Sequence, residues 1–198
     1  MAARIGVLAS GGGTNLQAII DHFASIANPA GTIVLVASNR EKCGALERAR
    51  AAGIATKAFD ATDDGTALLK LLDDASADLV VLAGYLKHIP ENVIREYHGR
   101  IINIHPGLLP DFGGPGMYGS RVHAAVLASG ATSTGLTIHF VDDEYDHGPV
   151  IAQWRVRVKI DDTAESLAKR VLSAEHIVYP RVVDMVAALN TAGLAANF

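Results

Sequence analysis

The chain of 198 residues is 49% hydrophobic and carries a formal net charge of -4 at pH 7. This charge excludes the basic surface that holds a nucleic-acid backbone, and the longest apolar run, Leu79 to Tyr85, is far shorter than the roughly 18 residues of a membrane-spanning helix. Cys43 is the single cysteine and no signal segment precedes the first strand-like run, so we expect a cytoplasmic protein whose residues 1–198 form one domain, with neither nucleic acid nor membrane as a partner.

The first part of the chain alternates between strand-like runs and helix-like segments. Short runs rich in branched aliphatic residues predict strands at Ile5–Ala9, Ile33–Ala37, Leu79–Ala83 and Ile101–Ile104. Apolar residues at helical spacing predict helices at Leu16–Ile26, Gly44–Ala52, Thr66–Ser76, Pro90–Tyr97 and Arg121–Ala128. Such an alternation is typical of βαβ units and a parallel sheet.

The pattern of the sequence changes after Gly130, from alternating strands and helices to consecutive strands. Residues Ser133–Val141 and Val150–Val158 predict two antiparallel strands around a polar tip, and a last helix is expected to begin near Thr163, to be disturbed at Pro180 and to continue to Leu189. The complete pattern predicts an α/β fold with an open, mainly parallel, Rossmann-like sheet flanked by helices and an antiparallel portion near the C-terminal half.

A glycine loop, Ser10-Gly11-Gly12-Gly13-Thr14-Asn15, joins the first strand to the first helix. Glycines permit a close backbone approach, and a helix N-terminus offers free N–H groups, so an anion is the expected ligand. Leu16 stands where a dinucleotide motif has its third glycine, and no lysine follows as in a P-loop, which disfavours a nicotinamide cofactor and a nucleoside triphosphate. The alternative is a tight turn without a ligand.

Asn103 and His105 lie at the carboxyl end of a predicted parallel strand, two residues apart and therefore on the same side. An amide donor and an imidazole at this edge suit addition to a carbonyl, where an oxyanion and a proton must be handled. Taken alone, a histidine at a strand end is more often a packing or capping residue.

The loop from Asp142 to Gly148 is dense in carboxylates. For Asp142, Asp143 and Glu144, a solvated hairpin tip is an equally good interpretation. We also considered a metal site, but the candidate ligands show none of the recognised short spacings and no metal is expected. Those candidates are His105, His123, His139, Asp146 and His147.

Three motifs, taken in order, resemble the phosphoribosylglycinamide formyltransferases, a folate-dependent formyltransferase family. They are the glycine loop leading into Leu-Gln-Ala-Ile-Ile, then Asn103-Ile-His-Pro-Gly-Leu-Leu-Pro110, then His139-Phe-Val-Asp-Asp-Glu-Tyr-Asp-His-Gly-Pro-Val-Ile151. The resemblance covers essentially the whole chain and implies a single formyltransferase domain over residues 1–198. The Asn-x-His and Asp set is shared across folate formyltransferases, whereas the glycine loop and Ala174-Glu175-His176 point to the purine-pathway member.

The resemblance implies a formyl transfer from 10-formyltetrahydrofolate, a co-substrate, to the amine of glycinamide ribonucleotide in de novo purine biosynthesis. It implies that the catalytic residues are Asn103, His105 and Asp146. The implied ribonucleotide contacts are Gly12, Gly13, Thr14, Asn15, Leu172, Ser173, Ala174 and Glu175. The implied folate contacts are Leu86, Lys87, His88, Ile89, Asn103, Asp142, Asp143, Glu144, Tyr145 and Asp146.

The mechanism that the resemblance implies is direct attack by the amine on the formyl carbon, with Asn103 and His105 stabilising the oxyanion and Asp146 beside His105. A carboxylate near an imidazole favours its charged form, so we expect the pKa of His105 to lie above about 6.5.

This chain departs from the family pattern at several places, including the segment Ala-Thr-Asp-Asp-Gly before Leu68, where many members have an arginine. Lys87 stands where many members have arginine, and the stretch from Asp111 to Arg121 is longer than the usual loop. Three alternatives stay open: a 10-formyltetrahydrofolate hydrolase, a formyltransferase acting on another amine, and a non-catalytic module that binds a phosphate ligand. Hydrolase and tRNA-modifying relatives have additional domains that these residues do not contain. The protein is expected to be a monomer or a homodimer.

Overall fold

The computed structural model describes residues 1–193, which form one mixed sheet flanked by helices. The strand order across the seven-stranded sheet of this region is β3-β2-β1-β4-β5-β6-β7. Strands β1 to β5 pair in parallel, and β6 pairs antiparallel with both β5 and β7, which confirms the predicted fold class. The strands are β1 (Ala3–Leu8), β2 (Gly31–Ser38), β3 (Thr56–Ala58), β4 (Leu79–Leu82), β5 (Ile101–His105), β6 (Ser133–Phe140) and β7 (Val150–Arg157).

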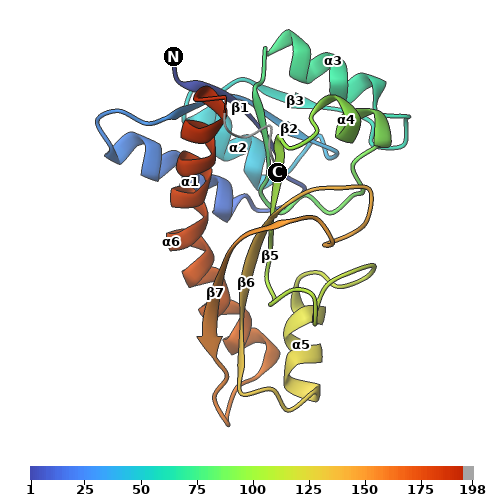
Figure 1. Cartoon of the computed structure of the whole chain (residues 1–198), viewed down its shortest axis with the longest axis vertical. Helices are drawn as coiled ribbons and strands as arrows, with labels where there is room; N and C mark the ends of the chain where they lie inside the picture. The colour runs from blue at the N-terminus through green and yellow to red at the C-terminus, as the bar shows by residue number, and fades with distance from the viewer. Residues whose placement is uncertain (194–198) are drawn as a thin grey trace.

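Helices cover both faces of the sheet (Figure 1). One apolar cluster joins the sheet to α1, α2, α5 and α6, and a second joins the opposite face to α3 and α4. The helices are α1 (Thr14–Ser25), α2 (Gly44–Ala51), α3 (Thr66–Asp74), α4 (Glu91–Glu96), α5 (Ser120–Ala128) and α6 (Ala164–Thr191). In the described part of the chain, no helix is both long enough and apolar enough to cross a membrane.

Burial on both faces explains why the central strands are continuously apolar. Neighbouring residues of a strand point to opposite faces, and here Val81 joins the first cluster while Val80 joins the second. Strand β3 was not predicted from the sequence, because its three residues are largely exposed and too few to show a pattern.

Helix α6 runs along the sheet from the antiparallel end to the parallel end (Figure 1). The helix begins next to Thr163, as expected from the sequence, and Thr163 and Ser166 form a capping box there. The disturbance predicted at Pro180 does not interrupt the helix, which continues through that residue. The preceding residue, Tyr179, is fully buried, and its hydroxyl donates a hydrogen bond of 2.9 Å to the carbonyl of Leu82, which fixes α6 against the end of β4.

Candidate active site

A pocket of about 630 Å³ opens at the carboxyl ends of β4 and β5. Asn103 and His105 line it from β5, as predicted, and Asp146 lines it from the loop after β6. The expected folate residues Leu86, Lys87, His88, Ile89, Asp142, Glu144 and Tyr145 also line the pocket. The predicted residues therefore lie together where the pairing in the sheet changes from parallel to antiparallel, at β5.

His105 is buried beneath the loop that follows β5. Its Nε2 lies 2.6 Å from the carbonyl oxygen of Phe112, and its Nδ1 lies 3.3 Å from Oδ2 of Asp146. A carbonyl only accepts hydrogen bonds, so Nε2 must carry a proton here. In the neutral imidazole Nδ1 then has none, whereas protonation would let both nitrogens donate.

The prediction of a raised pKa for His105 was wrong. Burial lowers the pKa of this imidazole, because the charged form loses its hydration, and this effect exceeds the opposing effects of the Asp146 carboxylate and the Phe112 carbonyl. The charge of Asp146 alone would raise the pKa of His105, but the side chain of His105 is only 3% exposed. The resting imidazole is therefore predominantly neutral at pH 7.

Asp146 is held from several sides. Gly114 donates its N–H to Oδ2 at 3.0 Å, and Nε2 of His139 lies 3.6 Å from Oδ1. Burial alone would raise the pKa of Asp146, but the neighbouring His139 and His105 and the Gly114 N–H together lower it. Asp146 also has a φ of 57°, a left-handed conformation that is uncommon outside glycine and recurs at functional sites.

His139 was considered in the sequence only as a metal ligand, yet it orients Asn103. The two residues face each other in the antiparallel pairing of β5 and β6. Nδ1 of His139 donates to the Phe140 carbonyl at 2.8 Å, so its Nε2 can accept from Nδ2 of Asn103 at 3.1 Å. The second N–H of the Asn103 amide then remains available for a ligand.

His123 is a second histidine whose place in the pocket the sequence did not reveal. It projects from α5, is almost fully buried, and burial and the nearby His105 lower its pKa. Among the described residues, no group of three or more His, Cys, Asp or Glu side chains is arranged to hold a metal ion.

The glycine loop meets the other end of this pocket. Asn15 lines the pocket and donates from Nδ2 to Oε2 of Glu175 at 2.7 Å. Thr14 lines a separate, more open depression, whereas Gly12 and Gly13 line neither. Gly13 has a φ of 73°, and a Cβ there would lie 2.5 Å from Cα of Ala45, so only glycine fits.

One face of α6 forms the wall beside the glycine loop. Leu172 and Glu175 line the pocket as expected, and burial raises the pKa of Glu175 despite the hydrogen bond from Asn15. Ser173 and Ala174 do not line it: the Ser173 hydroxyl donates to the Lys169 carbonyl, and Ala174 packs against the core. The sequence missed further lining residues at helical spacing on this face, namely Glu165, Ala168 and Lys169.

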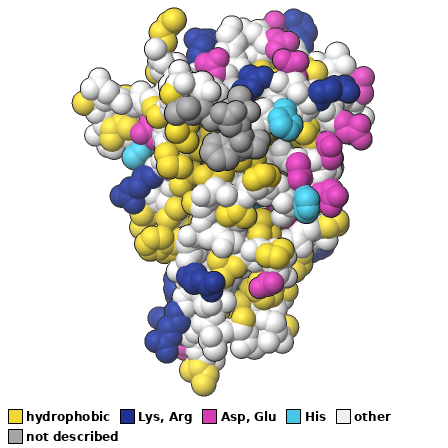
Figure 2. Space-filling model, in the orientation of Figure 1, with side chains coloured by type: hydrophobic (Ala, Val, Ile, Leu, Met, Phe, Trp, Pro, Cys, Tyr) yellow, Lys and Arg dark blue, Asp and Glu magenta, His cyan; other side chains and the backbone are white. Residues whose placement is uncertain are grey.

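The carboxylate-rich loop from Asp142 to Gly148 forms part of the pocket wall. His88 packs edge-on against Tyr145 with 4.9 Å between ring centroids, and its Nε2 lies 3.2 Å from the carbonyl oxygen of Asp143. Asp143 itself does not line the pocket. Figure 2 shows acidic side chains gathered along the right-hand edge, where Figure 1 places α3, α4 and the loop between β6 and β7.

The family model described as formyl transferase matches residues 3–183 of this chain. The chain belongs to the formyl transferase family. The Asn103, His105 and Asp146 arrangement thus lies within the part of the chain that this formyl transferase shares with its family.

Individual relatives of this formyl transferase carry a more specific name. It is 42% identical over 187 residues to the phosphoribosylglycinamide formyltransferase of Escherichia coli (strain K12), which covers 91% of this chain and 85% of the relative. It is 45% identical over 190 residues to a chloroplastic enzyme of the same name from Arabidopsis thaliana, covering 92% of this chain. The chain spans 65% of the length of that relative and 60% of one from Vigna unguiculata.

Solved structures agree with these relatives. The crystal structure of phosphoribosylglycinamide formyltransferase from Brucella melitensis superposes on the formyl transferase described here with a TM-score of 0.85 at 40% identity, covering 95% of this chain and 97% of that one. One from Anaplasma phagocytophilum gives a TM-score of 0.86 at 38% identity, covering 94% and 88%.

Proposed function

We propose that this chain is a phosphoribosylglycinamide formyltransferase, which transfers a formyl group from 10-formyltetrahydrofolate to the amine of glycinamide ribonucleotide in purine biosynthesis. The observation that carries the proposal is a single pocket whose two ends are lined by different sets of polar residues. His105, Asn103 and Asp146 stand at one end, and Asn15 with Glu175 stands at the other. Residues 1–198 would act as a single cytoplasmic formyltransferase domain, as a monomer or a homodimer.

The ribonucleotide lies with its phosphate on the backbone of Gly12, Gly13, Thr14 and Asn15, where free N–H groups and the positive end of α1 favour an anion. Glu175 accepts from the ribose hydroxyls. The folate lies between the segment Leu86–Ile89 and the loop of residues 142–146, whose backbone groups read the edges of the pterin ring.

The amine attacks the formyl carbon, and a C–N bond forms while the carbonyl oxygen becomes an oxyanion. The amide of Asn103, oriented by His139, donates to this oxygen together with His105, whose Nε2–H must leave the Phe112 carbonyl to do so. The buried imidazole is neutral at rest, and the developing negative charge raises its affinity for a proton beside Asp146. His105 takes up the proton that the amine loses, the carbonyl re-forms as the C–N10 bond of the folate breaks, and His105 then donates a proton to N10, so that no proton is gained or lost overall.

The test follows the absorbance change on deformylation of 10-formyltetrahydrofolate, with and without glycinamide ribonucleotide. We expect turnover that requires the ribonucleotide and yields stoichiometric formylglycinamide ribonucleotide by mass spectrometry. Turnover without the ribonucleotide would instead identify a hydrolase. Turnover with a different amine only would identify another formyltransferase, and the absence of turnover in every mixture would favour a non-catalytic binding module.

A further inference from the structure

The carbonyl groups of Gly11, Gly12 and Gly13 all accept hydrogen bonds from within the protein. The Gly11 carbonyl accepts from Ala45 N at 3.0 Å, the Gly12 carbonyl from Arg48 Nε at 2.8 Å, and the Gly13 carbonyl from Gln17 N at 2.9 Å. Within residues 1–193, none of the backbone N–H groups from Gly11 to Asn15 donates a hydrogen bond. Hydrogen bonds to its carbonyl groups thus hold the loop in place, while its backbone N–H groups remain available to a ligand.

Arg48 is the one side chain among these three partners. It is half-buried on α2, and its Nη1 also donates to Oε1 of Gln17 on α1 at 3.2 Å. Its remaining nitrogen, Nη2, makes no hydrogen bond to any described residue. A single guanidinium therefore links α2, the loop and the first turns of α1, and still has donor capacity left.

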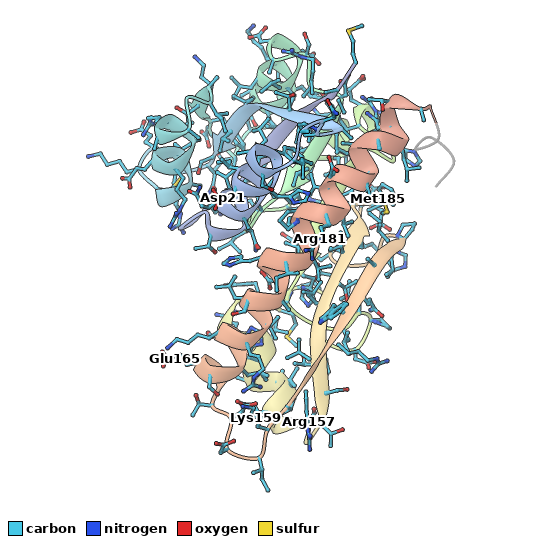
Figure 3. All side chains as sticks on the ribbon, turned by 90° about the vertical axis from the view of Figure 1, so that its left-hand side faces the viewer. Asp21, Arg157, Lys159, Glu165, Arg181 and Met185 are labelled. Atoms are coloured by element: carbon cyan, nitrogen blue, oxygen red, sulfur yellow. The ribbon has the colours of Figure 1, made fainter. Side chains whose placement is uncertain are left out.

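Arg48 borders an open depression of about 460 Å³ beside the start of α1. Thr14, Gln17, Ala18, Asp21, His22 and His176 line the rest of it. Figure 3 shows α1, with Asp21 labelled, alongside the middle of α6, from which His176 projects. The acid in this depression is engaged by the chain itself, because the side-chain amide of Gln17 donates to Asp21 at 2.8 Å.

Two sheltered polar atoms flank the loop without a hydrogen-bond partner among the described residues. One is Oδ1 of Asn15, a residue that is only 9% exposed and lines the main pocket. The other is Nε2 of His176, on the side of Arg48. Since buried polar atoms are rarely left unpaired, a ligand that lies across the loop and offers donors and acceptors would supply partners for both. A phosphorylated sugar has both.

We propose that Arg48 is a specificity-determining residue for the substrate phosphate: it holds the glycine loop with its N–H groups outward and supplies the fixed positive charge that a dianionic phosphomonoester needs. This inference rests on the proposed function, since it concerns the phosphate of the same substrate. Backbone dipoles contribute only about half a charge at a helix N-terminus, which leaves most of a dianion unbalanced. An arginine does not titrate in the working range and offers donors in a planar fork, so its charge and its hydrogen bonds are available together.

The test compares Arg48→Met and Arg48→Lys with the matched control Arg50→Met, which removes the same charge from an exposed position on the same helix. For Arg48→Met we expect the KM for glycinamide ribonucleotide to rise about 10- to 100-fold, with kcat and the KM for 10-formyltetrahydrofolate close to wild type. Arg48→Lys should lie between, because lysine keeps the charge but cannot hold Gly12 and Gln17 at once. Arg50→Met should match the wild type.

Ribose 5-phosphate binding, measured by calorimetry, separates this inference from the proposed function. If wild type binds ribose 5-phosphate and Arg48→Met does not, the role of Arg48 stands even where glycinamide ribonucleotide is not formylated. A wild-type KM for the ribonucleotide in Arg48→Met would overturn the inference. So would an equal loss toward both substrates, since this would mean general damage to the fold. If Arg48→Met does not fold, a wild-type KM and affinity in Arg48→Lys would overturn it in the same way.

Discussion

The parallel and antiparallel halves of the sheet supply two different kinds of ligand contact. In the parallel half, the glycine loop after β1 offers backbone N–H groups, and its side chains matter mainly because they are small. At the antiparallel junction, the contacts come from side chains, namely Asn103, His105, His139 and Asp146. A backbone site recognises a charge and limits its sequence through the space that it leaves for side chains, whereas a side-chain site performs chemistry and depends on the chemical group of each residue.

The largest difference between the two halves should appear when a side chain is removed from the antiparallel junction. In His105→Ala, we expect kcat to fall about 10²- to 10⁴-fold, because an oxyanion donor and a proton donor are lost together. The KM for glycinamide ribonucleotide should change little, since the phosphate contacts lie elsewhere. Steady-state kinetics check this, with the exposed His98→Ala as the control. An equal loss of activity in both variants would contradict the assignment.

The backbone site is tested by adding a methyl group. Gly13 and Gly53 have nearly the same φ, 73° and 72°, but a Cβ at Gly13 would lie 2.5 Å from Cα of Ala45, whereas a Cβ at Gly53 would meet nothing within 4 Å. We expect Gly53→Ala to lower the free energy of unfolding by about 1 kcal/mol, from backbone strain alone. Gly13→Ala should cost roughly 1–3 kcal/mol more, because of the steric overlap. Urea denaturation measures both, and equal losses would show that the loop can move away.

A smaller effect is expected from neutralising Asp146. Burial already holds the pKa of His105 below its ordinary value, and the Asp146 carboxylate partly opposes that effect. In Asp146→Asn, the pKa of His105 should therefore fall further, which an NMR titration of the imidazole can follow. A pKa that stays the same or rises would show that the two side chains are not electrostatically coupled in solution.

The stability of the folded protein should also depend on pH. Burial lowers the pKa values of His105, His123 and His176, so the folded protein keeps them neutral where the unfolded chain takes up protons. The free energy of unfolding should be at its full value above about pH 6.5 and fall as the pH drops below it, by at most about 1.4 kcal/mol per pH unit for each proton. His147, whose pKa Asp142 raises, acts in the opposite sense but is exposed.

His123→Phe isolates one of these contributions. This variant should flatten the decline in unfolding free energy between pH 6.5 and 5, because one group no longer takes up a proton on unfolding. Denaturant titrations at several pH values provide the measurement. An unchanged slope would mean that His123 titrates alike in the folded and unfolded states.

The sequence predicted most of the fold because local patterns encode it. The apolar runs of β1, β4 and β5 and the periodic face of α1 were each recognisable without knowledge of any contact. The positions of Asn103 and His105 followed from a strand end, and the motif order supplied Asp146. The local sequence did not show which residues from distant segments surround each of these side chains.

The missed features of the site all depend on contacts between distant segments. His139 orients Asn103 only because β6 pairs with β5 in one particular register. The lowered pKa of His105 depends on the burial of its side chain in the folded protein, which exceeds the opposing effects of Asp146 and Phe112. Arg48 reaches the glycine loop from a helix whose docking could not be read from its own residues.

Because Asn103 pairs with His139, the effect of an insertion on the candidate active site depends on where the residue is added. A shift of β6 by one residue would turn His139 to the opposite face of the sheet and leave the amide of Asn103 unsupported. Residues added to the turn between α5 and β6 can be absorbed without moving this pair, whereas a residue added within β6 cannot. Length variation among natural or designed versions of this protein should therefore collect in the connecting loops and be rare within the strand that carries His139.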